Sequence, residues 1–366
     1  MKSKIMISNR QFSILVTMSL IGTTILIIPH LVGTDAKQDA WMSAIITFVA
    51  AVPLILLYTR LYYLYPGNTF TQLFQVACGK WMGKILAAVY LLTFPLIINS
   101  LSLRNVGDFL VTQIMPETPI EAIHIIVMLV AVYAVHLGIE AIARIGELLI
   151  PITMFFLIIM FIMLIPNINL DFLFPVFEHG FKPVLQGSLT FYSFPFMEGV
   201  MYIMVMPLVK EQKKLFKAYF IGILIGWFIL FVTTLFTILV LGPFITSNEV
   251  FPSFVLAKSI AVPNILERIE LTIAIAWFIT SFFRVCFYFY CVVAGLSQLF
   301  NVTYHWIINF FAAIATVVIS VTISRNINLL LNFDQTLWPI VTGVCGLALP
   351  LLLFVVLLIK RSLRKG

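Results

Sequence analysis

Charged residues are scarce in this sequence: they make up 10% of its 366 residues, while hydrophobic residues make up 62%. Soluble domains carry far more charge, so this composition excludes a water-soluble globule. The sequence has four cysteines and five histidines, all scattered, which indicates neither a disulfide framework nor a metal site. It also has no nucleophile elbow, phosphate-binding loop or HExxH motif. We therefore expect a binding or carrier protein without cofactor or metal, and not an enzyme.

Apolar runs recur along the whole chain, each close to the roughly 20 residues that a helix needs to cross a bilayer. The segments between them are short, so we expect one all-α integral membrane domain over residues 1–366. We predict ten transmembrane helices at 11–32, 40–64, 84–110, 119–138, 141–165, 183–208, 216–242, 265–294, 304–324 and 336–359. The first run has no small-residue cleavage site after it, so we expect it to stay as a span rather than act as a signal peptide.

Most of the 22 Lys and Arg residues lie near the two termini or in the loops on the terminal side of the predicted spans. Because basic residues are retained on the cytoplasmic side of membrane proteins, both termini are expected to be cytoplasmic. The net charge of +7 then reflects insertion topology. We infer no nucleic-acid partner from it.

Residues 20–29, LIGTTILIIP, interrupt the first apolar run. Gly22 is a poor helix former, and the hydroxyls of Thr23 and Thr24 can bond to backbone groups in place of regular helix contacts. A helix that restarts here presents free N–H groups and its positive dipole end, which favour an anionic group. We expect these residues to line a ligand site; the alternative is that Gly22 only allows close helix packing.

A second interruption is expected in the sixth span, where FYSFPFMEG at 191–199 contains Pro195 and Gly199. Many transporters consist of two inverted repeats whose first helices are both broken, and their ligands bind between the breaks. The sequence thus predicts a 5+5 inverted repeat with broken helices 1 and 6. Repeat one covers about 11–165, repeat two covers about 183–324, and spans 9 and 10 at 304–359 are expected to be peripheral.

A charged residue inside a predicted span needs a partner or a task, and two pairs of such residues stand out. Arg104 and Asp108 are four residues apart on one helix and are expected to form a structural pair. Glu198 and Arg284 have no opposite charge one turn away on their own helices. Either they pair across spans 6 and 8, or one of them contacts ligand. The hydroxyls of Tyr192, Tyr288 and Tyr290 are expected near the breaks, where they could orient a ligand.

The order of four motifs resembles the B subunit of GerA-type spore germinant receptors: GTTILIIP at 22–29, MPETP at 115–119, FMEG at 196–199 followed by KEQKK, and ERIELTIAIAWFITSFFR at 267–284. This family is the spore-permease branch of the amino acid/polyamine/organocation superfamily. The resemblance covers the whole chain and implies a leucine-transporter-like fold in the spore inner membrane. It also implies two partners, an A-type membrane subunit and a C-type lipoprotein.

The resemblance implies that the chain binds a small nutrient, often an amino acid, in the cavity that transporter relatives use for substrate. By position, that cavity would include Gly22, Phe94 and Ile98, Pro195, and Arg284 and Tyr288. With the residues chosen from the breaks, the candidate ligand-binding set is Gly22, Thr23, Thr24, Phe94, Ile98, Tyr192, Pro195, Glu198, Arg284 and Tyr288.

Arg284 departs from the pattern, because relatives that bind small neutral amino acids have a small residue near this position. It also stands where sodium-coupled relatives of this fold place a cation-coordinating segment, so its guanidinium could replace the ion.

Two functions stay open on the sequence: a germinant-sensing receptor subunit, and a proton- or sodium-coupled amino acid transporter. Both use the same fold, and fold does not choose between them.

Overall fold

The computed structural model describes residues 6–260, 269–302, 306–324 and 326–363, and within these ranges the chain forms helices and no strand. One isolated bridge pairs Ile7 with Val209. Seven helical segments are long and apolar enough to cross a membrane, and a bent helix pair would make an eighth. The expected all-α, multipass membrane protein is confirmed at this level. This finding does not establish ten spans, so that number stays a prediction.

The first half of the chain forms α1 (Asn9–Ile21), α2 (Thr24–Ala36), η1 (Lys37–Asp39), α3 (Ala40–Leu64), α4 (Phe70–Cys78), α5 (Lys80–Thr93), α6 (Pro95–Gln113), α7 (Ile120–Leu137) and α8 (Ile139–Leu164). After the short 3-10 turns η2 (Ile165–Asn167) and η3 (Leu170–Leu173), the second half begins with α9 (Phe181–Phe191).

The second half continues with the π-turn η4 (Tyr192–Phe196), the 3-10 helices η5 (Met197–Met204), η6 (Met206–Leu208) and η7 (Gln212–Lys214), then α10 (Leu215–Asn248), α11 (Pro252–Lys258), α12 (Ile269–Phe300), α13 (Trp306–Thr322), α14 (Ile327–Thr336), α15 (Trp338–Thr342), the π-turn η8 (Gly343–Ala348) and α16 (Leu349–Leu363).

Two predicted spans differ in their details. The span expected at 265–294 is α12, which continues to Phe300; positions 265–268 of that prediction lie outside the described residues. The span expected at 336–359 is present as one apolar helical segment, Trp338–Leu363, in which the π-turn η8 separates α15 from α16. It is preceded by α14, where the sequence predicts no span. The axes of α13 and α14 differ by 101°, so the chain turns sharply between them.

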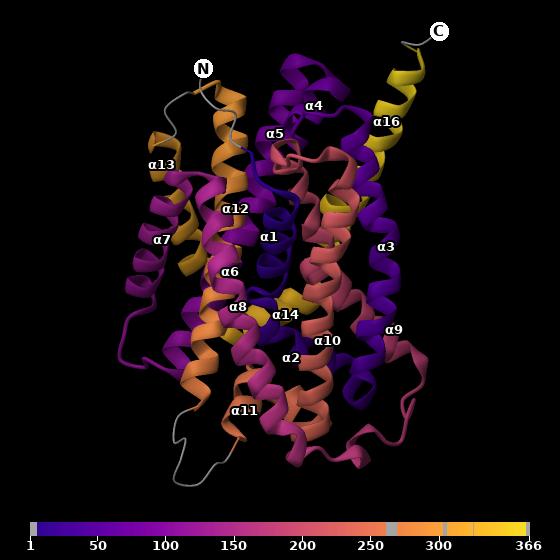
Figure 1. The fold of residues 1–366 in the computed structure, drawn as a ribbon, viewed down its shortest axis with the longest axis vertical. Coiled ribbons are helices and arrows are strands. Elements are labelled where there is room, and N and C mark those ends of the chain that lie inside the picture. Colours follow the sequence, from indigo (N-terminus) through magenta and orange to yellow (C-terminus); the bar gives the residue numbers. More distant parts are fainter. Residues whose placement is uncertain (1–5, 261–268, 303–305, 325, 364–366) are drawn as a thin grey trace.

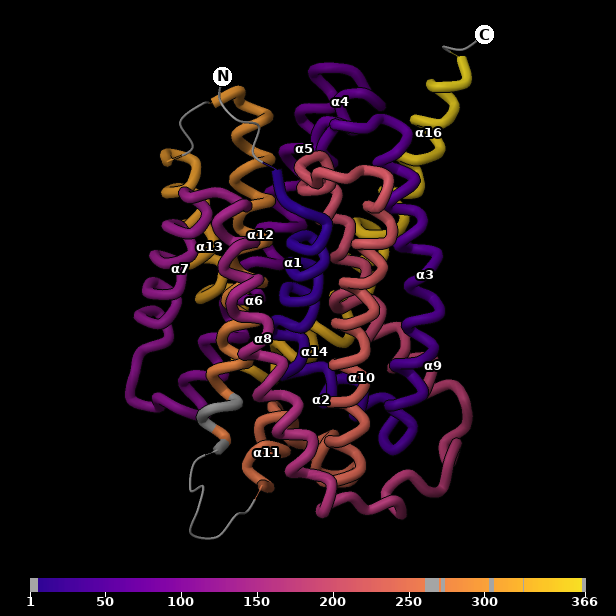
Figure 2. Tube along the Cα trace, in the orientation of Figure 1, coloured from indigo at the N-terminus to yellow at the C-terminus, as the bar shows by residue number. Residues whose placement is uncertain are grey.

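Helix α1 lies at the centre of the molecule, with α10 and α12 on either side of it (Figure 1). Close approach to α10 depends on Gly222, where an added Cβ would lie 2.7 Å from the Ser13 carbonyl oxygen. The Thr17 hydroxyl donates to the Gly222 carbonyl over 3.0 Å. The tube in Figure 2 shows that α1 begins at the same end of the molecule where α16 ends, with α11 at the opposite end. The interior of this bundle is where the two predicted breaks meet.

Candidate functional site

The first predicted break is present between α1 and α2. Gly22 has φ 24° and ψ −132°, a backbone conformation that residues with a side chain rarely adopt. Helix α2 restarts at Thr24 after Thr23, whose side chain makes no capping hydrogen bond to the new helix. The first N–H groups of α2 are therefore not capped by that side chain, which is the condition for anion binding at a helix N-terminus.

The second predicted break is also present, and it is longer than the sequence indicated. Phe194 has φ −95° and ψ 69°, outside the helical region, directly before Pro195. The chain then continues through 3-10 turns as far as Leu208 instead of returning to a regular α-helix. Glu198 lies in the first turn of η5, so the break places this carboxylate in the interior of the bundle.

Glu198 and Arg284, which have no opposite charge one turn away on their own helices, form an ion pair with each other. Arg284 on α12 donates through Nη2 to Oε2 of Glu198. Each side chain is only 1% exposed. The Tyr288 hydroxyl donates to the same carboxylate oxygen over 3.2 Å, and Trp338 Nε1 donates to Oε1 over 3.0 Å. The prediction that Glu198 and Arg284 pair across spans 6 and 8 is confirmed. Glu198 is a carboxylate surrounded by donors, as a buried anion requires.

Arg284 also connects this pair to the first break. Its Nη1 donates to the Ser19 carbonyl oxygen over 3.2 Å and lies 3.5 Å from the Thr24 hydroxyl. Its Nε donates to Ser102 Oγ on α6 over 3.0 Å. The guanidinium group thus occupies the space between the end of α1, the start of α2 and α6. Its carbon Cζ also lies 5.4 Å from the centre of the Phe194 ring, which adds a cation–π contact from the second break.

The stem of Arg284 explains why residue 22 is a glycine. A Cβ added at Gly22 would lie 2.6 Å from Cδ and 2.7 Å from Cβ of Arg284, closer than carbon atoms can approach. The close-packing role that was the alternative for Gly22 is therefore present, and its partner is the arginine. A ligand-contacting role for Gly22 stays a prediction.

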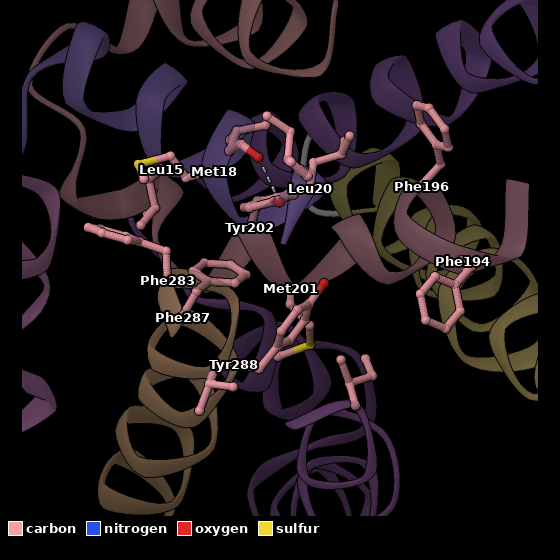
Figure 3. Packing of buried hydrophobic residues seen from close by; sticks show 14 of the residues in the cluster. Leu15, Met18, Leu20, Phe194, Phe196, Met201, Tyr202, Phe283, Phe287 and Tyr288 are labelled. Atoms are coloured by element: carbon pink, nitrogen blue, oxygen red, sulfur yellow. Dashed lines mark hydrogen bonds between the residues drawn. The ribbon is translucent and has the colours of Figure 1, made fainter. Parts of the chain in front are cut away.

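Aromatic side chains pack beside the pair: Arg284 Cζ lies over the rings of Phe194 and Tyr288, and Figure 3 shows these two rings among the buried hydrophobic residues. Tyr202 from η5 stacks on Phe287 from α12 with ring centres 4.7 Å apart, and its hydroxyl lies 2.7 Å from Ser19 Oγ. Phe94, a predicted site residue, stacks on Trp338 with ring centres 6.1 Å apart, so it supports the indole that contacts Glu198. Ile98 is buried one turn further along α6, and Tyr192 is half-buried at the start of η4. Ligand contact by these residues stays a prediction.

Sequence reasoning missed three polar contributors to this centre: Ser102, Trp338 and Asp334. Asp334 lies on α14, is 1% exposed, and neither of its carboxylate oxygens has a hydrogen-bond partner among the described residues. The signal for Asp334 and Trp338 was available in residues 327–338, INLLLNFDQTLW, where an aspartate and an indole interrupt an apolar run. Asp334 falls between the predicted spans at 304–324 and 336–359, and Trp338 falls inside the second of them. No group of three His, Cys, Asp or Glu able to hold a metal ion occurs within the described ranges.

The other predicted pair, Arg104 and Asp108 on α6, is confirmed with Nε and Oδ2 2.8 Å apart. Arg104 has a second task that the sequence did not show. Its Nη1 donates to the Ser324 carbonyl oxygen over 2.9 Å, directly after the end of α13. The arginine therefore fixes the point where the chain turns from α13 towards α14.

Comparison with known proteins gives a family match over most of the chain. The model of a family described as "Spore germination protein", the spore permease family, matches residues 6–328. Spore germination protein KB of Bacillus subtilis (strain 168) is 29% identical over 99% of this chain and 97% of the relative. Spore germination protein A2 of the same organism is 24% identical over 79% of each chain.

Solved structures of transporters have the same fold. The nucleobase-cation-symport-1 family transporter Mhp1, in a closed conformation with bromovinylhydantoin bound, aligns with a TM-score of 0.72 at 12% identity, covering 94% of this chain and 78% of its own. MhsT in complex with L-phenylalanine aligns with a TM-score of 0.70 at 13% identity, covering 98% and 97%. At these identities the likeness shows the fold and nothing about the ligand.

Proposed function

We propose that this chain, which belongs to the spore permease family of spore germination proteins, is the nutrient germinant-sensing subunit of a spore germination receptor. Its family and fold are those of permease-type membrane proteins. The observation that carries the proposal is the buried ion pair of Glu198 and Arg284. Glu198 lies at the second break, and Arg284 also donates to Ser19 at the first, so the pair connects both interrupted segments. A ligand that breaks this contact would act on both breaks at once.

The ligand in this proposal is a small nutrient, with an amino acid as the first candidate, bound between the two breaks. An anionic group on the ligand has two available partners: the free N–H groups at the start of α2, and the guanidinium of Arg284. A ligand carboxylate that takes over Arg284 would displace Glu198. Because a ligand shifts a conformational equilibrium only through different affinities for the two states, this exchange of partners is the step that would report binding.

The proposal extends to the arrangement in the membrane. We propose ten crossings with both termini cytoplasmic, and two inverted repeats at about 11–165 and 183–324, with 304–359 peripheral. The supporting observations are the breaks at the first helix of each repeat and the placement of the start of α1 and the end of α16 at one end of the molecule. An A-type membrane subunit and a C-type lipoprotein in the spore inner membrane are the proposed partners.

The direct test is ligand binding to the purified full-length chain in lipid nanodiscs. The unfolding temperature would be measured with each of the standard amino acids, and at least one should raise it progressively as the ligand concentration increases. The same amino acid should trigger germination of spores that carry the complete receptor. A panel in which no nutrient changes the unfolding temperature, and in which germination does not depend on this chain, would reject the proposal.

A second candidate function is secondary transport of an amino acid, and the likeness to Mhp1 and MhsT is the observation that favours it. Uptake of the bound nutrient into proteoliposomes that contain this chain alone separates the two. Accumulation above the outside concentration under a proton or sodium gradient supports the transporter. Binding without accumulation supports the receptor subunit.

A further inference from the structure

Asp334 differs from Glu198 and Arg284 because its side chain has no hydrogen-bond partner in the part of the chain that the structure describes. It lies on the ten-residue helix α14 and is 1% exposed. Both carboxylate oxygens are without hydrogen bonds among the described residues. Its neighbour in sequence, Gln335, donates to the Leu31 carbonyl oxygen over 3.3 Å, which fixes α14 against α2. Asp334 is therefore buried as long as α14 stays packed against α2.

Two charged groups belong to the same centre, Glu198 and Arg284: Trp338, four residues after Asp334, donates to Glu198, and Glu198 is paired with Arg284. Helix α2, against which α14 packs, also carries two titratable residues: Asp35 accepts from Thr190, and His30 makes no hydrogen bond to Asp334. The charge of Arg284 is already paired with Glu198. An ionised Asp334 would therefore add a second negative charge to a site whose one cation is occupied.

The two carboxyl groups have opposite surroundings. Glu198 accepts from three donors, as a charged carboxylate does. Asp334 accepts from none of the described residues. Removing an ionised carboxylate from water without a partner is far more costly than removing a neutral carboxyl group, so such a group takes up a proton instead. When two nearby acids lie in such different environments, one can be ionised while the other keeps its proton.

We propose that Asp334 is a proton-binding site: it carries a proton in the packed arrangement, beside the ionised pair of Glu198 and Arg284. The proton would be lost when α14 separates from α2 and water reaches the carboxyl group. The O–H bond of the carboxyl then breaks, the proton passes to water, and the carboxylate left behind is hydrated. Opening of the centre would thus be linked to release of one proton, whichever nutrient binds and whether or not anything is transported.

Infrared spectroscopy of the full-length protein in nanodiscs tests this directly, because a protonated carboxyl group has a carbonyl band separate from those of amides and carboxylates. Aspartate labelled with ¹³C at its side-chain carboxyl should shift this band in the wild type at neutral pH. The substitution Asp334→Asn, which keeps the size and neutrality of the side chain, should remove it. Asp108→Asn, at the buried aspartate paired with Arg104, should leave the band unchanged and is the matched control.

A second measurement covers release of the proton. On unfolding at neutral pH, the wild type should release one more proton to a pH indicator than Asp334→Asn does, since the exposed aspartate ionises. A band that does not shift on aspartate labelling, or that persists in Asp334→Asn, overturns the proposal, as does equal proton release by the two proteins. If Asp334→Asn fails to fold, the labelled wild type and single Asn substitutions at the other four aspartates assign the band by elimination. None of these results depends on nutrient binding, so the proposal can fail while the receptor function stands.

Discussion

At the scale of single residues, the centre of this protein is organised by one rule: a charge removed from water needs donors or an opposite charge. Glu198 has three donors, and Arg284 uses every nitrogen of its guanidinium group on a partner, in Glu198, Ser19 and Ser102. Gly22 has no side chain because the stem of Arg284 occupies that space. These three positions therefore depend on one another, and substitutions at them are not independent.

Substitution Arg284→Met should lower the free energy of unfolding by about 3–5 kcal/mol, because Glu198 would stay buried without its cation. The double change with Glu198→Gln should recover most of that loss, since the neutral amide can place its oxygen where Oε1 accepts from Trp338 and its NH2 group beside the Tyr288 hydroxyl, which can also accept. Equilibrium unfolding of the purified variants in mild detergent measures both effects. A double variant as unstable as the single one would contradict this account of the pair. If the recovered double variant also ceases to respond to nutrient, Arg284 contacts the ligand.

Substitution Gly22→Ala should destabilise the protein by at least about 1–3 kcal/mol, the usual cost of a strained backbone conformation, with the clash against Arg284 added to it. The matched control is Gly343→Ala, at a helical position where an added Cβ meets nothing within 4 Å. That change should be neutral or stabilising by about 0.4–1 kcal/mol. Equal effects of the two substitutions in thermal unfolding would show that Gly22 has no special packing role.

A larger side chain at the same position probes function. Gly22→Leu should abolish the germination response of spores while the protein level in the spore membrane stays normal, because the side chain would displace Arg284 from the space between the breaks. A normal response at normal nutrient concentration would place the ligand site elsewhere.

At the scale of secondary-structure elements, three interrupted segments meet at the centre instead of the two that were expected. Besides the breaks at Gly22 and Pro195, the turn between α13 and α14 directs Asp334 and Trp338 inward. Arg104 holds this turn by donating to the Ser324 carbonyl oxygen while it pairs with Asp108. The predicted structural pair thus also positions a part of the candidate site.

Substitution Arg104→Gln should loosen α14, seen as faster amide hydrogen exchange over residues 327–336. The physical reason is that the carbonyl groups after α13 lose their charged donor and Asp108 loses its cation. Arg144→Gln is the matched control: Arg144 forms the same four-residue pair with Glu140, but on an exposed surface where such pairs contribute about 0–1 kcal/mol. Exchange in α14 that is unchanged by Arg104→Gln, or changed equally by both variants, would argue against the role assigned to Arg104.

At the scale of the whole molecule, the chain has the fold of the transporters Mhp1 and MhsT, with a permanent cation between its broken first helix and α12. A guanidinium group stays protonated in proteins, so it can fill the place of a bound cation but cannot carry a proton. The residue that we propose to bind a proton is therefore Asp334, and the place of a sodium ion at the first break is filled by Arg284.

We therefore predict that the protein does not require sodium. The unfolding temperature of the wild type, with and without nutrient, should be the same in sodium chloride and in choline chloride of equal ionic strength. Nutrient-triggered germination should likewise persist when sodium is replaced by choline. A nutrient effect that strictly requires sodium would contradict the replacement of the ion by Arg284.

Local features of the sequence predicted much of this structure. Hydrophobic run length gave α3 at its observed bounds, 40–64, and gave α7 and α8 to within two residues, because an apolar helix is a property of its own residues. Gly22 and Pro195 marked two breaks through their effects on the helix backbone. The third break was missed because α14 has only ten residues and contains polar side chains, so it resembles a loop when hydropathy is averaged along the chain.

The sequence by itself determined that this is a helical membrane protein with two interrupted spans, since composition and backbone preferences act within each segment. It also restricted Glu198 and Arg284 to pairing or ligand contact, because neither has an opposite charge one turn away. Only the tertiary structure decided that they contact each other, that Trp338 and Tyr288 complete the shell of the carboxylate, and that Asp334 is buried without a partner. These are contacts between residues 86–140 positions apart. Such contacts depend on how helices pack against one another, which no local pattern in the sequence records.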